Sequence, residues 1–220
     1  MKVSPKRLAN KLRRHAVKHA FVNGWDSPKI DPFNGNSDFM GVMLHHTAGT
    51  NSLNWIVNTN PYAPVRACHF LVTRSGLVQV VSGVGAYHAG KGGPWRFPNG
   101  QIIAKDSGNR FFYGIEIESL GEEMAIKDGP KAINANQVVE TAKLCAALLD
   151  AMAIGPRSLP VNRVIRHRDW AFGRKVDVRQ DLAWWHQVIG IARRNARHPA
   201  TVDAEIRAFI RKHPSGRYKA

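Results

Sequence analysis

Histidines and an aspartate stand at the ends of apolar runs in this sequence. His45 and His46 end one such run, His167 follows another, and Asp177 comes ten residues after His167 in a loop. Two imidazoles and one carboxylate, with a fourth position open to water, are a ligand set of catalytic zinc. A single histidine at a strand end is more often a surface or core residue, so the pattern indicates a zinc site only if these segments converge.

Two carboxylates follow in a strand-like run near the middle of the chain. Because side chains alternate between the two faces of a strand, Ile115 and Ile117 are predicted on one face and Glu116 and Glu118 on the other. The apolar face can pack on a helix while the carboxylates face a cleft. A carboxylate near a zinc-bound water can take its proton and later deliver it to a leaving amine.

The elements that must position these groups are predicted from periodicity. Short runs rich in β-branched and aromatic residues predict strands over 39–44, 67–73, 77–82, 111–119 and, as a fifth, 163–166. Apolar stripes predict helices over 5–19, 135–152, 180–197 and from a Thr201 cap onward. This mixture predicts an α/β fold, a single domain with a central mixed β-sheet flanked by helices.

Positive charge is concentrated at the two ends of the chain. The net charge is +16, and residues 1–36 and 185–220 each hold eight Lys or Arg against two acids. We therefore predict a basic N-terminal extension (1–36), a catalytic domain (37–198) and a basic C-terminal helix (199–220). These ends could attract polyanions such as nucleic acid, anionic membranes or anionic wall polymers, among which charge alone does not choose, or they could simply cap the fold.

Other features exclude several classes of protein. Cys68 and Cys145 have no metal-binding spacing and are expected to be buried free thiols. No apolar stretch suits a signal peptide or a membrane span, so we expect a soluble protein made in the cytoplasm without a signal peptide. Trp170, Trp184 and Trp185 could stack on a sugar, but burial is the commoner fate of tryptophan.

Five segments occur in an order that is more specific than any one of them. They are LHHTAG (44–49), HFLVTRSG (69–76), AYHAG (86–90), YGIEIES (113–119) and HRDWAFGRKVD (167–177). Together they resemble the type 2 N-acetylmuramoyl-L-alanine amidases, a family shared by phage endolysins, bacterial cell-wall recycling amidases and animal peptidoglycan recognition proteins. The resemblance implies hydrolysis of the bond between N-acetylmuramic acid and L-alanine in peptidoglycan, as in a monomeric endolysin that lyses its host. It adds the expectation that the zinc lies in a surface groove.

The resemblance also implies roles for individual residues. The Zn²⁺ ligands would be His45, His167 and Asp177, where some members have cysteine in place of the aspartate. The catalytic residues would be Glu116 as the general base and Lys175 beside the developing oxyanion. His46 is expected to be structural or to contact substrate, and His88 to line the substrate groove. Glu118 could raise the proton affinity of Glu116, or it could be solvated or ion-paired.

Two other functions stay open at this point. A non-catalytic peptidoglycan-binding protein is disfavoured because all three candidate ligands are present. A nucleic-acid-binding protein would explain the charge, but the sequence has no base-stacking or recognition-helix signature. Bound zinc together with wall-lytic activity would indicate an amidase, whereas salt-sensitive DNA binding would indicate a nucleic-acid-binding protein.

Overall fold

The computed structural model describes residues 2–153, 158–196 and 198–218. Six strands form its main sheet: β1 (His19–Phe21), β2 (Gly41–His46), β3 (Phe70–Val72), β4 (Val78–Val80), β7 (Phe112–Ile117) and β8 (Val164–Arg166). Their order across the sheet is β1-β4-β3-β7-β2-β8. Neighbouring strands are parallel except for the antiparallel pair β3 and β4, so the predicted mixed sheet is confirmed.

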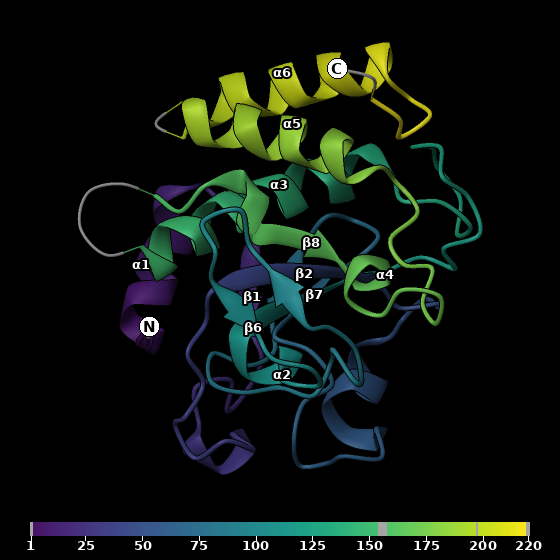
Figure 1. The fold of residues 1–220 in the computed structure, drawn as a ribbon. Coiled ribbons are helices and arrows are strands. Elements are labelled where there is room, and N and C mark those ends of the chain that lie inside the picture. Colours follow the sequence, from purple (N-terminus) through teal and green to yellow (C-terminus); the bar gives the residue numbers. More distant parts are fainter. Residues whose placement is uncertain (1, 154–157, 197, 219–220) are drawn as a thin grey trace.

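Four longer helices cover one face of this sheet. They are α1 (Pro5–Arg14), α3 (Ala135–Met152), α5 (Leu182–Arg194) and α6 (Pro199–Lys212). The central helix α3 contacts β2, β3 and β7, with α1 and α5 packed beside it. Helix α6 packs on α5 and α3 and forms the outermost layer, at the top of Figure 1.

Short elements and loops cover the other face. They include the hairpin of β5 (Trp95–Arg96) and β6 (Ile102–Ile103), the short helices α2 (Gly108–Phe111) and α4 (His167–Trp170), and the turns η1 (Pro28–Ile30) and η2 (Trp55–Thr59). The turn η3 (Val161–Arg163) contacts α5 instead. Irregular segments of this kind are where binding and catalytic residues are most often found, because a rigid sheet beneath them fixes their position.

Helix α3 begins and ends where its sequence dictates. Asn134 accepts a hydrogen bond from the Gln137 amide, and the Gln137 side chain accepts one from the Asn134 amide, which completes a capping box. Most of the residues that follow are apolar, and the helix is buried from Gln137 almost to its end. Its buried charges, Glu140 and Lys143, pair with each other at 2.7 Å, so the helix can lie inside the layered structure between the sheet and α6.

Alternation along the strands separates the core from the site. Leu44 and Ile115 belong to the core cluster that includes the residues of α3. Met43 and Phe112 belong to a second cluster, on the opposite face, around Trp170. His45 follows Leu44 and Glu116 follows Ile115, so both polar side chains lie on the face away from α3.

Several expectations need correction. The predicted helix over 5–19 ends at Arg14, and His19 already belongs to β1, which pairs with β4. The last helix begins at Pro199 with His198 as its N-cap, so the Thr201 cap is wrong, because proline with its fixed φ suits the first helical position. Helix α5 ends at Arg194, and residue 197 lies outside the described residues.

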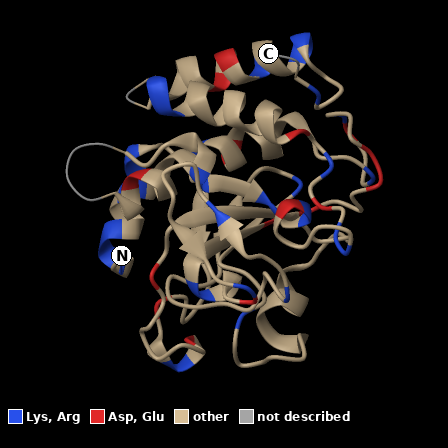
Figure 2. Ribbon diagram, in the orientation of Figure 1, with Lys and Arg blue, Asp and Glu red and all other residues tan. Residues whose placement is uncertain are grey.

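The two basic ends share the core of the rest of the chain. Leu8 and Leu12 of α1 and Ile206 and Ile210 of α6 are buried in the same cluster as α3. Lys and Arg mark both helices in Figure 2. The cationic ends are thus folded parts of the molecule, whereas their division into separate extensions stays a prediction.

Other expectations are confirmed. Cys68 and Cys145 are free and buried. Trp170, Trp184 and Trp185 are at most 2% exposed, which removes them as sugar-stacking platforms. Among the described residues, no helix has the length and apolar character needed to cross a membrane.

Candidate metal centre

Parallel strands bring the two metal-binding candidates together. His45 lies near the end of β2, and His167 follows directly after β8, which pairs with β2 in parallel. Both residues therefore lie at the same edge of the sheet. The loop after α4 returns Asp177 to this edge, where the Arg168 amide donates a 2.7 Å hydrogen bond to the Asp177 carbonyl oxygen.

Three side-chain atoms converge at this edge. The Nδ1 atoms of His45 and His167 are 2.9 Å apart, and Asp177 Oδ2 is 3.0 Å from His167 Nδ1 and 3.5 Å from His45 Nδ1. The three residues are buried, with exposures of 1%, 4% and 6%. The predicted ligand set is thus brought into one compact group, which could hold a metal ion.

Hydrogen bonds determine which ring nitrogen carries the proton. A carbonyl oxygen can only accept, so His88 Nε2 donates to the Phe112 carbonyl at 2.9 Å, and His167 Nε2 donates to the Ala89 carbonyl at 3.0 Å. The Nδ1 atom of neutral His88 then accepts from His45 Nε2, 3.0 Å away. In the neutral form of His45 and His167, Nδ1 is therefore the unprotonated nitrogen.

This arrangement fits a cation of zinc type. In the neutral rings the Nδ1 atoms of His45 and His167 carry lone pairs and no proton. Both atoms face the carboxylate oxygen of Asp177, which also carries no proton when ionised. Ligand atoms around a tetrahedral zinc lie about 3.3 Å apart, since each bond is about 2.0–2.1 Å long. The observed separations bracket that value. Hydrogen bonds from the remote ring nitrogens to carbonyls are also the usual support of histidine ligands.

Burial keeps these groups ready for a metal. Burial and the nearby His167 lower the pKa of His45 to about 4, despite the opposing effect of Asp177. Burial alone would raise the pKa of Asp177, but its contacts with His167 and His45 outweigh burial and hold the pKa well below its ordinary value. At neutral pH the site therefore presents a neutral His45 imidazole beside an ionised carboxylate, the forms that bind metal.

Glu116 lies next to the metal-binding group. The parallel register pairs it with His45, and both side chains line one cavity together with Lys175. Burial and the Asp177 carboxylate raise the pKa of Glu116 to about 8, while Lys175 acts to lower it. Glu116 Oε2 is buried without a hydrogen-bond partner among the described residues. A carboxylate held in this state can exchange a proton near neutral pH.

Glu118 has a different environment from Glu116. Its carboxylate accepts hydrogen bonds from the Ser52 amide at 2.8 Å and from the Arg74 amide at 3.1 Å. It is 5% exposed, so it is neither solvated nor turned toward the cavity. Its contacts tie the loop after β2 to the loop after β3, which is a structural role.

The two remaining histidines of the predicted site lie against glycines. A Cβ on Gly114 would come within 2.3 Å of the His88 ring, and a Cβ on Gly121 within 2.2 Å of the His46 ring. Both histidines line the cavity, but neither belongs to the metal-binding group. The absent side chains are what allow these rings to lie close to the backbone.

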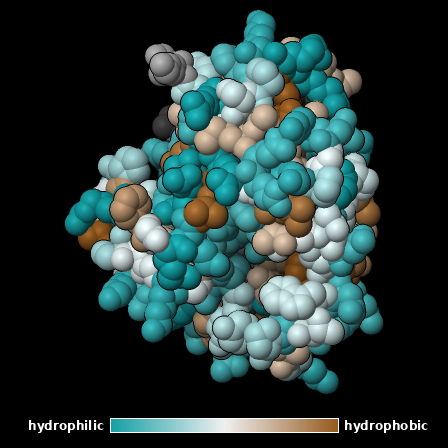
Figure 3. Space-filling view, turned by 90° about the vertical axis from the view of Figure 1, so that its right-hand side faces the viewer, coloured by the Kyte–Doolittle hydropathy of each residue, from teal (hydrophilic) through white to brown (hydrophobic). Residues whose placement is uncertain are grey.

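The cavity over the metal-binding group has a volume of about 430 Å³. Its rim includes Trp55 and Tyr62, which are 53% and 56% exposed, and also Tyr87 and Arg174. Sequence reasoning missed these four residues. For Trp55 and Tyr62 the available signal was the presence of aromatic residues in the polar, turn-rich stretch 50–65, where no periodic stripe required their burial. The face that carries α4 is mostly hydrophilic, with hydrophobic residues interspersed (Figure 3).

Two solved structures are similar to this chain. One similar solved structure is titled "Structure of PlyL", with 15% identity, a TM-score of 0.47, and coverage of 83% of this chain and 98% of that one. Another is an endolysin N-acetylmuramoyl-L-alanine amidase, LysCS from Clostridium intestinale URNW, with 18% identity, a TM-score of 0.42, and coverage of 70% and 84%. Among curated proteins, none matches the chain significantly.

The family pattern of N-acetylmuramoyl-L-alanine amidases matches residues 35–180, about two thirds of the chain. That range contains the whole metal-binding group and the cavity above it. The chain therefore belongs to the N-acetylmuramoyl-L-alanine amidase family.

Proposed function

We propose that this chain is a zinc-dependent peptidoglycan hydrolase that cleaves the amide bond between N-acetylmuramic acid and the L-alanine of the stem peptide. The family match supports the substrate class. The observation that carries the metal dependence is the convergence of two unprotonated Nδ1 atoms and one carboxylate oxygen at the floor of a cavity.

The reaction adds water across the scissile amide. Zinc held by His45, His167 and Asp177 would acidify a water molecule and polarise the amide carbonyl. Glu116 takes the proton that the attacking water loses and delivers it to the leaving nitrogen. Lys175, in the loop that also carries Asp177, places its positive charge near the carbonyl oxygen as negative charge develops there. The products are a lactyl carboxylate on the sugar and a free L-alanine amine on the peptide.

The other residues of the site orient these groups. His88 and the Ala89 carbonyl oxygen fix the ring orientations of His45 and His167 through their hydrogen bonds. Trp55 and Tyr62 provide exposed aromatic surface at the rim of the cavity, suited to the apolar faces of a sugar or to the stem peptide. We place His88 and His46 at the substrate-facing wall, as the resemblance implies.

The proposed biological setting is lysis of a bacterial host by a phage endolysin. Support comes from the resemblance of the five segments and from a charge of +16, which favours attraction to anionic cell walls. Purified walls with either diaminopimelate or lysine in the stem would identify the preferred host type.

Product analysis tests the proposal directly. A defined N-acetylmuramoyl-peptide is incubated with zinc-loaded protein, and the products are separated and identified by mass spectrometry. We expect a free N-terminal L-alanine, no cleavage after chelation, and recovery when zinc is returned. Cleavage of a glycosidic bond or of a bond within the stem, or no cleavage by zinc-loaded protein, would contradict the proposal.

A further inference from the structure

A second cavity, of about 830 Å³, lies away from the metal centre. Its lining comes from the C-terminal ends of α1, α3 and α5 and from the residues just before α6. In Figure 1, α1 lies at the left of the molecule and α4, which carries His167, lies at the right. The fold thus brings parts of both basic ends of the sequence to one place, remote from the catalytic cavity.

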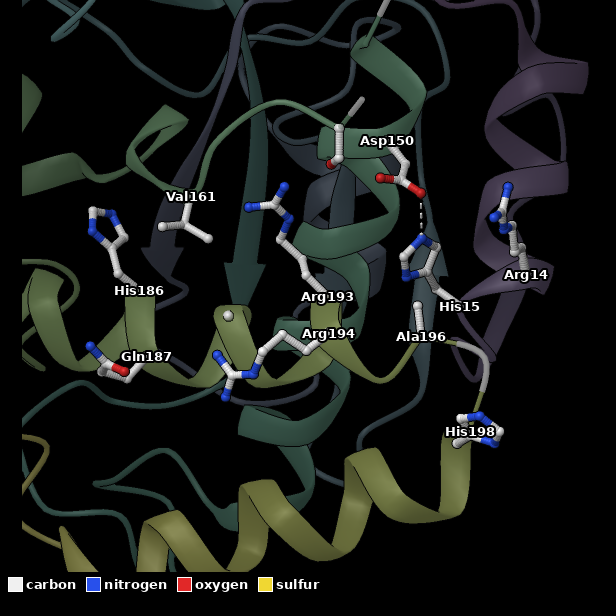
Figure 4. A pocket seen from close by; sticks show the side chains of 12 residues that line it. Arg14, His15, Asp150, Val161, His186, Gln187, Arg193, Arg194, Ala196 and His198 are labelled. Carbon is white, nitrogen blue, oxygen red and sulfur yellow. Dashed lines mark hydrogen bonds and ion pairs between the residues drawn. The ribbon is translucent and has the colours of Figure 1, made fainter. Parts of the chain in front are cut away.

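Three arginines give this cavity its charge. Arg14, Arg193 and Arg194 line it, and none of their side chains makes a hydrogen bond or ion pair within residues 2–153, 158–196 and 198–218. Arg14 and Arg194 are exposed and Arg193 is half-buried. In Figure 4 the side chain of Arg193 extends from α5 into the space between Val161 and Asp150, which lies at the end of α3. Unpaired guanidinium groups around a hollow can bind an anion without first breaking another contact.

Asp150 is the one acidic residue in the described lining, and it already has partners. His15 Nε2 lies 3.0 Å from its carboxylate, and Lys11 Nζ lies 3.8 Å away. These contacts, which outweigh burial, lower the pKa of Asp150 well below its ordinary value. The carboxylate is therefore ionised but compensated, and the three arginines remain in excess.

Helix dipoles offer a competing reason for the arginines, because cations at a helix C-terminus are stabilising. The end of α3, however, is already satisfied by Arg7, whose guanidinium donates to the carbonyl oxygens of Ala151 at 2.8 Å and Ala153 at 2.6 Å. Neither Arg193 nor Arg194 donates to a carbonyl at the end of α5 within the described residues. Arg7 therefore caps α3, and the dipoles of α1 and α5 can stabilise the cavity arginines without occupying their N–H donors.

Gly190 keeps the cavity open. It lies on α5 one turn before Arg193 and Arg194, and it lines the same hollow. A Cβ at this position would meet only Arg194 Nη1, 3.5 Å away. A larger residue would therefore fit the helix but occupy space above it. Gln187, which also lines the cavity, adds a neutral hydrogen-bond donor.

We propose that this cavity binds phosphate groups of a phosphodiester-linked anionic polymer of the bacterial envelope and so holds the enzyme on its substrate. Guanidinium groups bind phosphate oxygens through paired hydrogen bonds, which suits Arg14, Arg193 and Arg194. The choice of a wall polymer over other phosphodiesters rests on the proposed amidase function. Because the cavity is remote from His45 and His167, the polymer can stay bound while the amide is cleaved.

Binding of a fluorescent poly(glycerol phosphate) oligomer tests the proposal by anisotropy across a salt series. One variant carries Arg14→Gln, Arg193→Gln and Arg194→Gln. A matched variant carries Lys29→Gln, Lys105→Gln and Arg211→Gln, which removes the same charge from exposed positions outside the cavity. We expect at least a tenfold loss of affinity in the first variant and at most about a twofold loss in the second, since exposed charges far apart are screened.

A second test alters the shape of the cavity without altering its charge. Gly190→Gln should raise helix stability, because glycine is a poor helix former. We expect it to weaken polymer binding at least fivefold while the thermal midpoint stays the same or rises. Unchanged affinity in this variant would contradict a role for the cavity.

Three further outcomes would overturn the proposal. Equal losses of affinity in the two triple variants would show that binding depends only on net charge. A lower thermal midpoint with unchanged polymer affinity in the arginine variant would show that the arginines stabilise the helix ends and do not bind the polymer. Tighter binding to a single-stranded DNA of equal charge than to the polymer would identify a nucleic-acid site instead. Polymer binding is measured without cleavage of the amide. A chain that binds the polymer but does not cleave the amide would therefore contradict the amidase proposal and leave the binding proposal standing.

Discussion

The metal centre and the arginine cavity hold their ionisable groups in opposite ways. At the metal centre His45, His167 and Asp177 are buried and each ring nitrogen has a defined partner. In the cavity Arg14 and Arg194 are exposed and have no partner among the described residues. Buried groups can be fixed to a fraction of an ångström and have shifted pKa values, which chemistry requires. Exposed charges stay adaptable, which suits an extended polymer.

The comparison predicts that single changes act strongly at the metal centre and weakly in the cavity. Asp177→Asn should have the largest effect, because it removes the only carboxylate of the buried group that could hold a metal ion. We expect loss of stoichiometric zinc and a fall in activity of about a thousandfold or more. Metal analysis and a hydrolysis assay measure both.

Asp26→Asn is the matched control for this substitution, since Asp26 is exposed in a loop. It should leave zinc content and turnover unchanged. Retention of full zinc content by the Asp177 variant would mean that the carboxylate is not a ligand.

The next largest effect should come from Glu116→Gln. The variant keeps the three ligands but cannot take a proton, so we expect zinc to remain while turnover falls by roughly a hundredfold or more. Glu118→Gln is the comparison, because Glu118 accepts two backbone hydrogen bonds outside the cavity. We expect that variant to lose about 1–2 kcal/mol of stability and little turnover. The reverse outcome would exchange the roles of the two glutamates.

A smaller effect should follow from disturbing the support of His45. Gly114→Ala places a methyl group against the His88 ring, and His88→Ala removes the acceptor for His45 Nε2. Loss of such support weakens metal binding about 10- to 100-fold in other proteins. We expect a similar weakening in a competition titration with a zinc chelator. Unchanged affinity in both variants would show that His88 does not position the ligand.

The smallest effect is on the stability of the metal-free protein. The folded pKa of Glu116, about 8, is above the ordinary 4.5, so the folded chain keeps a proton that the unfolded chain releases. Stability from this group is full below pH 4.5 and is lost as pH rises toward 8. Metal-free Glu116→Gln should therefore be more stable than the wild type at pH 7, by on the order of 1–3 kcal/mol.

Urea unfolding of both metal-free proteins at pH 4 and pH 7 measures this difference. The advantage of the variant should vanish at pH 4, where the carboxyl is protonated in both states. A constant advantage at both pH values would show that burial of this charge is not its cause.

Sequence reasoning succeeded where local patterns are strong. The buried helix 135–152 was predicted with its observed bounds, and the apolar runs around His45, Glu116 and His167 predicted their strands. The strand β1 was missed because it is three residues long and pairs with β4, a contact that no local pattern encodes. The cap of α6 was misplaced because Pro199 fixes the start of the helix two residues earlier than Thr201.

The candidate site shows the same limit. Residue types and family order predicted the metal-binding group, and the structure brings it together. The hydrogen bonds that select Nδ1 as the free nitrogen could not be predicted, because the Phe112 and Ala89 carbonyl oxygens reach His88 and His167 only through tertiary packing. The arginine cavity was equally hidden, since it joins Arg14 to Arg193 across almost the whole chain.

The most direct test of the metal centre is a zinc titration of metal-free protein followed by hydrolysis of an N-acetylmuramoyl-peptide. Activity should be absent without metal, should rise in proportion to added zinc, and should level off at about one zinc per chain, because the described residues contain one group of three side chains that could hold a metal ion. Full hydrolysis by the metal-free protein, or activity that does not follow bound zinc, would contradict the account.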